Sequence, residues 1–181
     1  MMTILKIDSS ITGDASVSRQ LTAATVEQLA SQDRSRGVVE RDLVASPLSH
    51  LTLGGSGDAD VLDEFLAADT IVIGAPMYNF TVPSQLKAWI DRILVAGKTF
   101  RYAANGPEGL VGGKRVIVAL SRGGFYEDGS AFEHAKSYLQ AAFGFIGITP
   151  EFVTADGIAV GPDEREAGIA SGLAEVGRLA A

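Results

Sequence analysis

The sequence of 181 residues contains no cysteine. Disulfides, thiolate metal sites and cysteine nucleophiles are therefore excluded, and any redox chemistry has to come from a bound cofactor. Histidine is almost as scarce, because only His50 and His134 are present and they lie far apart in the chain. Neither is expected to ligate a metal ion, so we predict no metal site.

Clusters of basic residues are also missing. Lys and Arg together number 15 against 22 Asp and Glu, which gives a formal net charge of −7 and argues against a nucleic-acid partner. No apolar run is long enough to cross a bilayer, and no basic segment followed by an apolar stretch is found at the start of the sequence. These absences predict a cytoplasmic protein with no membrane partner. Because no internal repeat is present, we expect residues 1–181 to form a single domain.

Apolar runs typical of strands alternate along the chain with segments in which apolar residues recur at helical spacing. Strands are expected at residues 2–7, 37–43, 70–74, 114–120 and 149–155, and helices at 18–30, 60–68, 83–93, 130–143 and 164–179. Ser16 or Ser18 is expected to cap the first helix, and Ser130 the fourth. The alternation predicts an α/β fold, a doubly wound parallel sheet of strand order 2-1-3-4-5 with helices on both faces. In that order, the loops after the first, third and fourth strands meet around one crevice.

The loop after the third expected strand carries an unusual mixture of side chains. Residues 75–80 read Ala-Pro-Met-Tyr-Asn-Phe, which places a thioether, two aromatic rings and a carboxamide at the carboxyl end of a buried strand. Such loops form the ligand crevice of open α/β sheets. Local sequence alone does not distinguish a ligand-binding role from a structural one. In the structural role, Met77, Tyr78 and Phe80 only cover the core and Asn79 supports a turn.

The loop after the first strand is rich in hydroxyl groups. Residues 8–18 include Ser9, Ser10, Ser16 and Ser18, and this segment leads into a helix N-terminus, where backbone N–H groups are available to an anion. Neither the Walker pattern nor the GxGxxG pattern occurs here, so a phosphate monoester fits better than a nucleoside triphosphate or a dinucleotide. A serine-rich helix cap without any ligand is the alternative.

Three further segments bear on the site. Residues 97–110 are expected to form a long ordered loop with two aromatic residues, and long loops in compact domains are usually functional. After the fourth strand, residues 121–126 read Ser-Arg-Gly-Gly-Phe-Tyr, where successive glycines let the backbone approach a flat ligand. The glycine-rich residues 53–57, in contrast, are interpreted as a connection with no anion-binding role.

Together these segments resemble the FMN-dependent NADH-azoreductases, which belong to the flavodoxin-like group that includes the NAD(P)H quinone reductases. The resemblance extends over nearly the whole chain and is carried by residues 75–80, 97–102, 105–110, 121–124 and 144–148. It implies a flavodoxin-like three-layer fold and a bound FMN reduced by NADH. Two departures are visible: Val17 stands where relatives often have Gln or Glu, and residues 49–60 form a shorter segment than in the best-known members.

The resemblance also assigns residues to the site. It implies that the FMN phosphate is held by Ser10, Ser16, Val17 and Ser18. The isoalloxazine would lie between Met77, Tyr78, Asn79 and Phe80 on one side and Ser121, Arg122, Gly123 and Gly124 on the other. A homodimer is implied, with active sites at the interface and a substrate slot lined by Phe80 of one subunit, Tyr102 and Phe145 of the other, and Phe125 and Tyr126.

The implied reaction passes hydride from NADH to FMN, releases NAD⁺, and then transfers two electrons to a quinone or azo compound in the same slot. The flavin carries this chemistry, so no side chain is expected to act as a nucleophile, and water or Tyr126 is the candidate proton donor. Two other functions stay open from the sequence: a flavodoxin-type electron carrier, and a reductase that supplies free reduced FMN. The first would be expected to carry the Thr/Ser-x-Thr-Gly-x-Thr run of flavodoxins, which the loop at residues 8–18 lacks.

Overall fold

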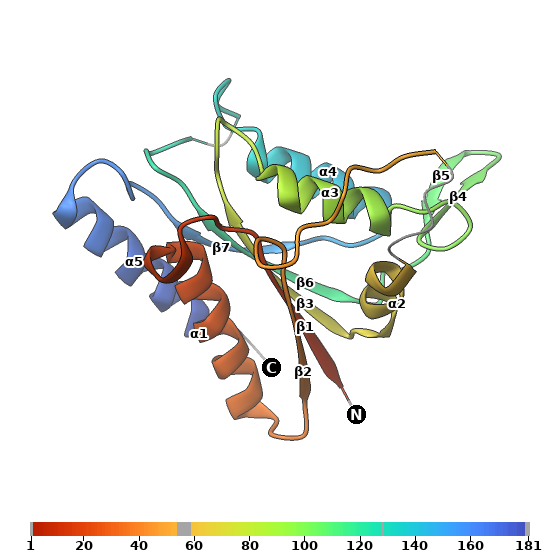
Figure 1. Cartoon of the computed structure of the whole chain (residues 1–181), viewed down its shortest axis with the longest axis horizontal. Helices are drawn as coiled ribbons and strands as arrows, with labels where there is room; N and C mark the ends of the chain where they lie inside the picture. The colour runs from red at the N-terminus through yellow and green to blue at the C-terminus, as the bar shows by residue number, and fades with distance from the viewer. Residues whose placement is uncertain (1, 54–58, 128, 180–181) are drawn as a thin grey trace.

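The computed structural model describes residues 2–53, 59–127 and 129–179 and contains a central parallel sheet (Figure 1). Its strands are β1 (Thr3–Asp8), β2 (Gly37–Asp42), β3 (Thr70–Pro76), β6 (Arg115–Ser121) and β7 (Glu151–Ala155). They lie in the order β2-β1-β3-β6-β7, and every neighbouring pair is parallel. Since β6 and β7 are the fourth and fifth strands of this sheet, the predicted order 2-1-3-4-5 is confirmed.

Successive strand residues face opposite sides of the sheet and so build two apolar cores. Leu5 and its register partner Ile71 belong to the core covered by α2 (Ala59–Ala67), α3 (Ser84–Ile93) and α4 (Ala135–Phe145). Ile4 and Val72 belong to the core covered by α1 (Val17–Gln32) and α5 (Pro162–Val176). The three layers predicted from the sequence are therefore present (Figure 1).

Helix α3, which follows the loop after β3, shows how the spacing of apolar residues in the sequence determines packing. Four apolar residues that recur at helical spacing in α3 are buried: Leu86, Trp89, Ile90 and Ile93. The Trp89 ring meets the Phe65 ring of α2 edge to face, with ring centroids 6.0 Å apart. Burying a large side chain of this kind contributes about 1.5–3 kcal/mol, so α3 is firmly fixed and can hold the loop that precedes it.

The expected long loop is a two-stranded antiparallel hairpin, β4 (Phe100–Ala103) and β5 (Gly106–Gly109), which lies beyond the α3 C-terminus (Figure 1). Phe100 is buried against Phe145 of α4, with ring centroids 4.6 Å apart. A Cβ atom at Gly109 would lie 2.1 Å from the Ile146 carbonyl carbon. Only glycine therefore allows the hairpin to approach the end of α4 so closely.

The prediction for the start and end of α4 was wrong. The helix begins at Ala135, Ser130 does not cap it, and it continues through Gly144 to Phe145. Ser130 Oγ instead accepts a hydrogen bond from Phe132 N (3.3 Å) in a local turn, while Glu133 Oε1 accepts one from Lys136 N (2.9 Å) in the first turn of the helix. Phe132, which lies within the predicted helix 130–143, precedes the helix in the structure and is exposed.

The outer edge of β7 is partly covered by α5. Thr154 N donates a hydrogen bond to Glu175 Oε2 of that helix (2.8 Å). Gly172 brings the helix close, because a Cβ atom there would lie 3.3 Å from Thr154 O. α5 is thus fixed to the sheet margin as well as to its face.

Residues 54–57 of the glycine-rich segment lie outside the described residues, so the interpretation of that segment stays a prediction. Within residues 2–53, 59–127 and 129–179, no helix is both long and apolar enough to cross a membrane.

Candidate functional site

The loops after β1, β3 and β6 open at one edge of the sheet and enclose a cavity of about 540 Å³. We call it the loop cavity. It is lined by Ser10, Thr12, Ala15, Ser16, Val17, Pro76, Met77, Tyr78, Ser121, Arg122, Gly123, Ile158, Ala159 and Arg165. Eight residues assigned to the cofactor are among these: Ser10, Ser16, Val17, Met77, Tyr78, Ser121, Arg122 and Gly123. The other four, Ser18, Asn79, Phe80 and Gly124, lie on the same loops but do not line it.

The loops after β1 and β3 are joined by the Tyr78 hydroxyl. It lies 3.1 Å from Ser10 Oγ and accepts a hydrogen bond from Ile11 N at 3.3 Å. Ser9 Oγ also donates to Gly74 O of β3 (2.6 Å), which fixes the start of the loop. The loop after β1 is therefore held by hydrogen bonds to β3 and to the loop that carries Met77 and Tyr78.

Arg19 clamps the same loop from the first turn of α1. Its Nη2 donates to Ser10 O (3.0 Å), and its Nη1 and Nη2 donate to the two carboxylate oxygens of Asp42, at 2.7 and 2.9 Å. These hydrogen bonds lower the pKa of Asp42 to about 2 and raise the pKa of Arg19. The Arg19 guanidinium is thus committed to holding the β1 loop against the end of β2.

The α1 N-terminus supplies hydroxyls and amides to the loop cavity. Of the two serines predicted as candidate caps, Ser16 is the N-cap, and its Oγ accepts a hydrogen bond from Arg19 N (3.2 Å). Ser18 Oγ lies 3.2 Å from Ser16 Oγ, and both residues are buried. A short 3₁₀ turn, η1 (Gly13–Ala15), brings the chain into this cap. The N–H groups of Val17 and Ser18 belong to the first turn, where an α-helix offers no carbonyl partner.

The loop after β3 closes in a tight turn that strains its backbone. Tyr78 N donates to Thr81 O (2.9 Å) and Thr81 N donates to Tyr78 O (3.1 Å). Between them, Asn79 and Phe80 have φ values of 47° and 74°. Asn tolerates the left-handed region, whereas Phe does so only at a cost, and such strain gathers at functional sites. The turn is held from outside by His134 N, which donates to Phe80 O (2.8 Å).

The loop after β6 is joined to the loop after β7. Arg122 Nε and Nη2 donate to the two carboxylate oxygens of Asp156, both at 2.7 Å, and Arg122 N donates to Ala155 O (2.9 Å). Its guanidinium also lies over the Tyr126 ring, 5.7 Å from the centroid. Arg122, which the sequence assigns to the cofactor, lines the loop cavity, and two of its nitrogens hold the start of the Gly123–Gly124 segment through Asp156.

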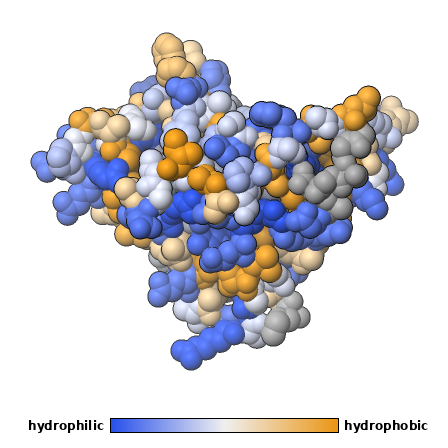
Figure 2. All heavy atoms as spheres, in the orientation of Figure 1, coloured by the Kyte–Doolittle hydropathy of each residue, from blue (hydrophilic) through white to orange (hydrophobic). Residues whose placement is uncertain are grey.

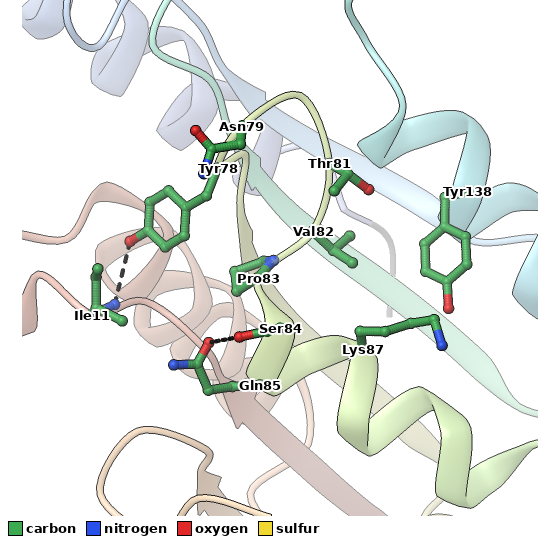
Figure 3. A pocket seen from close by; sticks show the side chains of 10 residues that line it. All are labelled: Ile11, Tyr78, Asn79, Thr81, Val82, Pro83, Ser84, Gln85, Lys87 and Tyr138. Carbon is green, nitrogen blue, oxygen red and sulfur yellow. Dashed lines mark hydrogen bonds between the residues drawn. The ribbon is translucent and has the colours of Figure 1, made fainter. Parts of the chain in front are cut away.

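A second cavity, of about 570 Å³, is also lined by Tyr78 (Figure 3). We call it the outer cavity. Figure 3 shows Tyr78 and Asn79 at one end of it and Lys87 and Tyr138 at the other. Burial, together with the charge of Asp91, raises the pKa of Tyr138 to about 12. Tyr78 therefore borders both cavities.

The expected substrate-lining residues do not gather within one chain. Phe80 lies at the α4 N-terminal end, where its ring is 5.6 Å from Phe132. Tyr102 and Phe145 instead pack around Phe100 beside the opposite end of α4. An 11-residue helix is about 16 Å long, so the two groups are well separated. Phe125 lies over Gly157, where a Cβ atom would come 2.6 Å from its ring.

Sequence reasoning missed several residues of the loop cavity. Ile158 and Ala159 come from the loop after β7, where Ala159 N donates to Gly123 O (2.9 Å). Arg165 comes from the first turn of α5, and Thr12 and Ala15 from the β1 loop. The only signal for the first three is their place after a parallel strand, because their residue types carry no motif.

The loop cavity fits FMN. Its volume lies within the usual range for small-molecule sites, roughly 300–1,000 Å³. At one end, hydroxyls and first-turn amides suit a phosphate; at the other, Met77, the Tyr78 ring and Gly123 suit a flat ring system. None of the described residues lining it is acidic, so no carboxylate opposes an anion there.

Comparisons with known proteins agree with this geometry. A family model described as a flavodoxin-like fold matches residues 2–179. The FMN-dependent NADH:quinone oxidoreductase 2 of Bradyrhizobium diazoefficiens is 58% identical over 193 aligned residues, covering 95% of this chain and 96% of the relative. The FMN-dependent NADH:quinone oxidoreductase of Methylobacterium radiotolerans is 52% identical over 205 residues, covering 99% of this chain and 100% of the relative.

Solved structures are similar as well. An azoreductase from Bacillus anthracis str. Sterne superposes with a TM-score of 0.87 at 31% identity and covers 98% of each chain. An FMN-dependent NADH-azoreductase from Bacillus anthracis str. Ames Ancestor, solved in complex with FMN, gives 0.84 at 26% identity, with 98% of this chain and 96% of that chain covered.

Proposed function

The chain belongs to the flavodoxin-like fold family and, within it, to the FMN-dependent NADH:quinone oxidoreductases, and from this membership we propose how its residues serve the reaction. It is an oxidoreductase that uses FMN and NADH to reduce quinones and azo compounds. A flavodoxin-type carrier and a supplier of free reduced FMN are not favoured, because the relatives are named as quinone oxidoreductases.

The observation that carries the site assignment is the convergence of three strand-end loops on one cavity that has a polar end and an apolar end. Bound FMN supplies the hydride chemistry between NADH and the acceptor. The proposed phosphate ligands are Ser10, Ser16, Ser18 and the amides of Val17 and Ser18. The isoalloxazine would lie against residues 77–80 on one side and 121–124 on the other.

The protein's own contribution is orientation. The Tyr78 hydroxyl fixes the loop after β1, and the Arg122–Asp156 pair fixes the loop after β6, so both walls of the loop cavity are preorganised. Phe80, at a strained turn, would present its half-exposed ring to the acceptor. Tyr126 is the proposed side-chain proton donor, in parallel with water.

We also propose a cytoplasmic homodimer in which each chain is a single domain. The cytoplasm is supported by the reductant, because the NADH pool is intracellular. The dimer is supported by exposed aromatic rings, which interfaces favour, and Tyr102 of the β4–β5 hairpin is 77% exposed. In such a dimer, Tyr102 and Phe145 of the partner subunit would complete the slot over Phe80.

The experiment is spectroscopic. The purified protein is expected to be yellow, to lose its flavin absorbance on anaerobic addition of NADH, and to recover it when a quinone is added. FMN that stays bound through turnover excludes a supplier of free reduced FMN, and failure of a quinone to reoxidise the protein contradicts the assigned reaction.

A pair of double variants tests the phosphate loop. Ser16→Ala with Ser18→Ala should weaken FMN binding, because each lost charge-assisted hydrogen bond is worth about 1.5–3 kcal/mol. Ser31→Ala with Ser35→Ala, two exposed serines beyond the site, is the matched control. Equal FMN affinity in the two double variants would remove the loop from the site.

A further inference from the structure

Arg165 is a cationic side chain at the polar end of the loop cavity that no sequence motif predicts. It lies in the first turn of α5 and lines the cavity together with Ala15, Ser16 and Val17. Its Nη2 donates to Ala15 O (2.8 Å), the last residue of η1. The guanidinium is thus held next to the N-cap of α1.

Its hydrogen bond leaves its charge uncompensated. A carbonyl accepts a hydrogen bond but carries no net charge, and in the described part of the chain this is the one contact recorded for the Arg165 side chain. The other two arginines at the site each face a carboxylate, Arg19 with Asp42 and Arg122 with Asp156. In a chain of net charge −7, a guanidinium at a cavity wall without an acidic partner is well placed to bind an anion.

The surrounding charges show why such a cation is needed. Asp14 lies in η1, and Asp163 and Glu164 lie in the first turn of α5, but none of these carboxylates lines the loop cavity. The α1 N-terminus offers only about half a unit of positive charge, and hydroxyls offer none. The serines and the helix N-terminus therefore leave most of the charge of a phosphate, nearly two negative units, without a cation to balance it.

We propose that Arg165 is a phosphate-binding residue that supplies the full positive charge facing the FMN phosphate, beyond the serines and amides of the β1 loop. The inference rests on the proposed FMN site and adds a specificity determinant to it. Because the charge acts on the phosphate alone, Arg165 should favour FMN over riboflavin, which has the same ring system without that group.

The test measures FMN and riboflavin dissociation constants, by quenching of flavin fluorescence, for the full-length apoprotein and two variants. Arg165→Gln removes the charge at the cavity. Arg178→Gln, just beyond the other end of α5, removes an equal charge where the side chain lines a different cavity and serves as the control. For Arg165→Gln we expect about a tenfold or greater loss of FMN affinity, with riboflavin affinity changed less than about twofold.

Salt and a conservative variant give further readouts. FMN affinity of the wild type and of Arg178→Gln should fall more steeply with NaCl concentration than that of Arg165→Gln. Arg165→Lys keeps the charge and should restore most of the FMN preference. Circular dichroism shows whether each variant is folded before binding is measured.

Opposite results overturn the inference. Equal loss of FMN and riboflavin affinity would mean that Arg165 acts only by holding Ala15, and unchanged FMN affinity would mean that it does not meet the phosphate. Both results leave the FMN site itself intact. A wild-type protein that bound neither flavin would overturn the proposed function together with this inference.

Discussion

Phe80 has a left-handed backbone φ of 74°, a region that favours glycine. An L-residue there costs about 1–2 kcal/mol through the contact of its Cβ with the following carbonyl. His134 N and the Tyr78–Thr81 hydrogen bonds hold the turn in this conformation. The ring is 49% exposed, so the strain is not repaid by burial of the side chain. A phenyl ring that is both strained and half-exposed adds little to stability, which is consistent with the proposed contact of Phe80 with the acceptor.

This strain can be measured with two variants. Phe80→Gly should be more stable to urea than Phe80→Ala by about 1 kcal/mol, because both remove the ring but only glycine relieves the φ. At Thr81, whose φ is negative, the order should reverse, with Thr81→Gly less stable than Thr81→Ala by roughly 0.5–1 kcal/mol. If alanine were as stable as glycine at both positions, the turn would not be strained in solution.

At the scale of elements, the Arg19–Asp42 pair joins α1 to the end of β2. Because the folded-state pKa of Asp42 is lowered from 3.8 to about 2, the pair stabilises the fold above the unfolded-state pKa, and this contribution is lost as the pH falls through the folded-state pKa. The Asp42 side chain is 37% exposed, so solvent screening reduces its contribution to about 1 kcal/mol.

Asp42→Asn should therefore unfold at lower urea concentration than the wild type near neutral pH, by about 1 kcal/mol, and this difference should shrink as the pH falls from about 4 towards 2. Asp63→Asn, at an exposed position of α2, is the control and should show no such pH dependence. A difference that stayed constant across this pH window would assign the effect to packing instead of charge.

The β4–β5 hairpin depends on one close approach. Gly109→Ala would place a methyl group 2.1 Å from the Ile146 carbonyl carbon and should destabilise the protein by at least about 1–3 kcal/mol or displace the hairpin. Gly113→Ala, with nothing within 4 Å of its Cβ, is the matched control. FMN affinity should be unchanged in both variants, because the hairpin lies away from the loop cavity. Equal thermal unfolding midpoints for the two variants would contradict the packing described.

Elements were predictable where local chemistry decided them. Ser16, one of the two serines predicted as the cap of α1, is the N-cap because it directly precedes the first helical residue. The buried apolar residues of α3 recur at helical spacing, as predicted for that segment. Ser130 failed as a cap because its hydroxyl is used in a local turn, while the N–H of His134 bonds to a residue more than fifty positions earlier. Arg165 and Ala159 were missed because the topology, not a local pattern, brings them to the loop cavity.

For the whole molecule, the separation of Phe80 from Tyr102 along α4 requires two chains if both are to meet one acceptor. Figure 2 shows apolar side chains reaching the surface in several groups on the face viewed, so this surface is not uniformly polar. A twofold contact would create two equivalent slots, each with Phe80 from one chain and Tyr102 and Phe145 from the partner subunit.

This arrangement predicts complementation. Phe80→Ala and Tyr102→Ala should each lower turnover of a bulky quinone, yet a heterodimer of the two, isolated with two different tags, should regain roughly half of the wild-type activity, because one of its two slots is free of both changes. Homodimers of each variant prepared with the same tags are the controls. A heterodimer no more active than these, or a fully active monomer in light scattering, would rule out the shared slot.

The bond from Thr154 N to Glu175 affects how molecules meet at high concentration. A strand from another molecule that tried to extend the sheet at β7 would have to displace a carboxylate and the helix that carries it. Addition of a strand through backbone hydrogen bonds, the first step towards fibrils, is therefore opposed at the outer edge of β7. Association through side chains, which can be specific and reversible, is not opposed by this bond, so the β7 margin allows contacts between surfaces while resisting the addition of a strand.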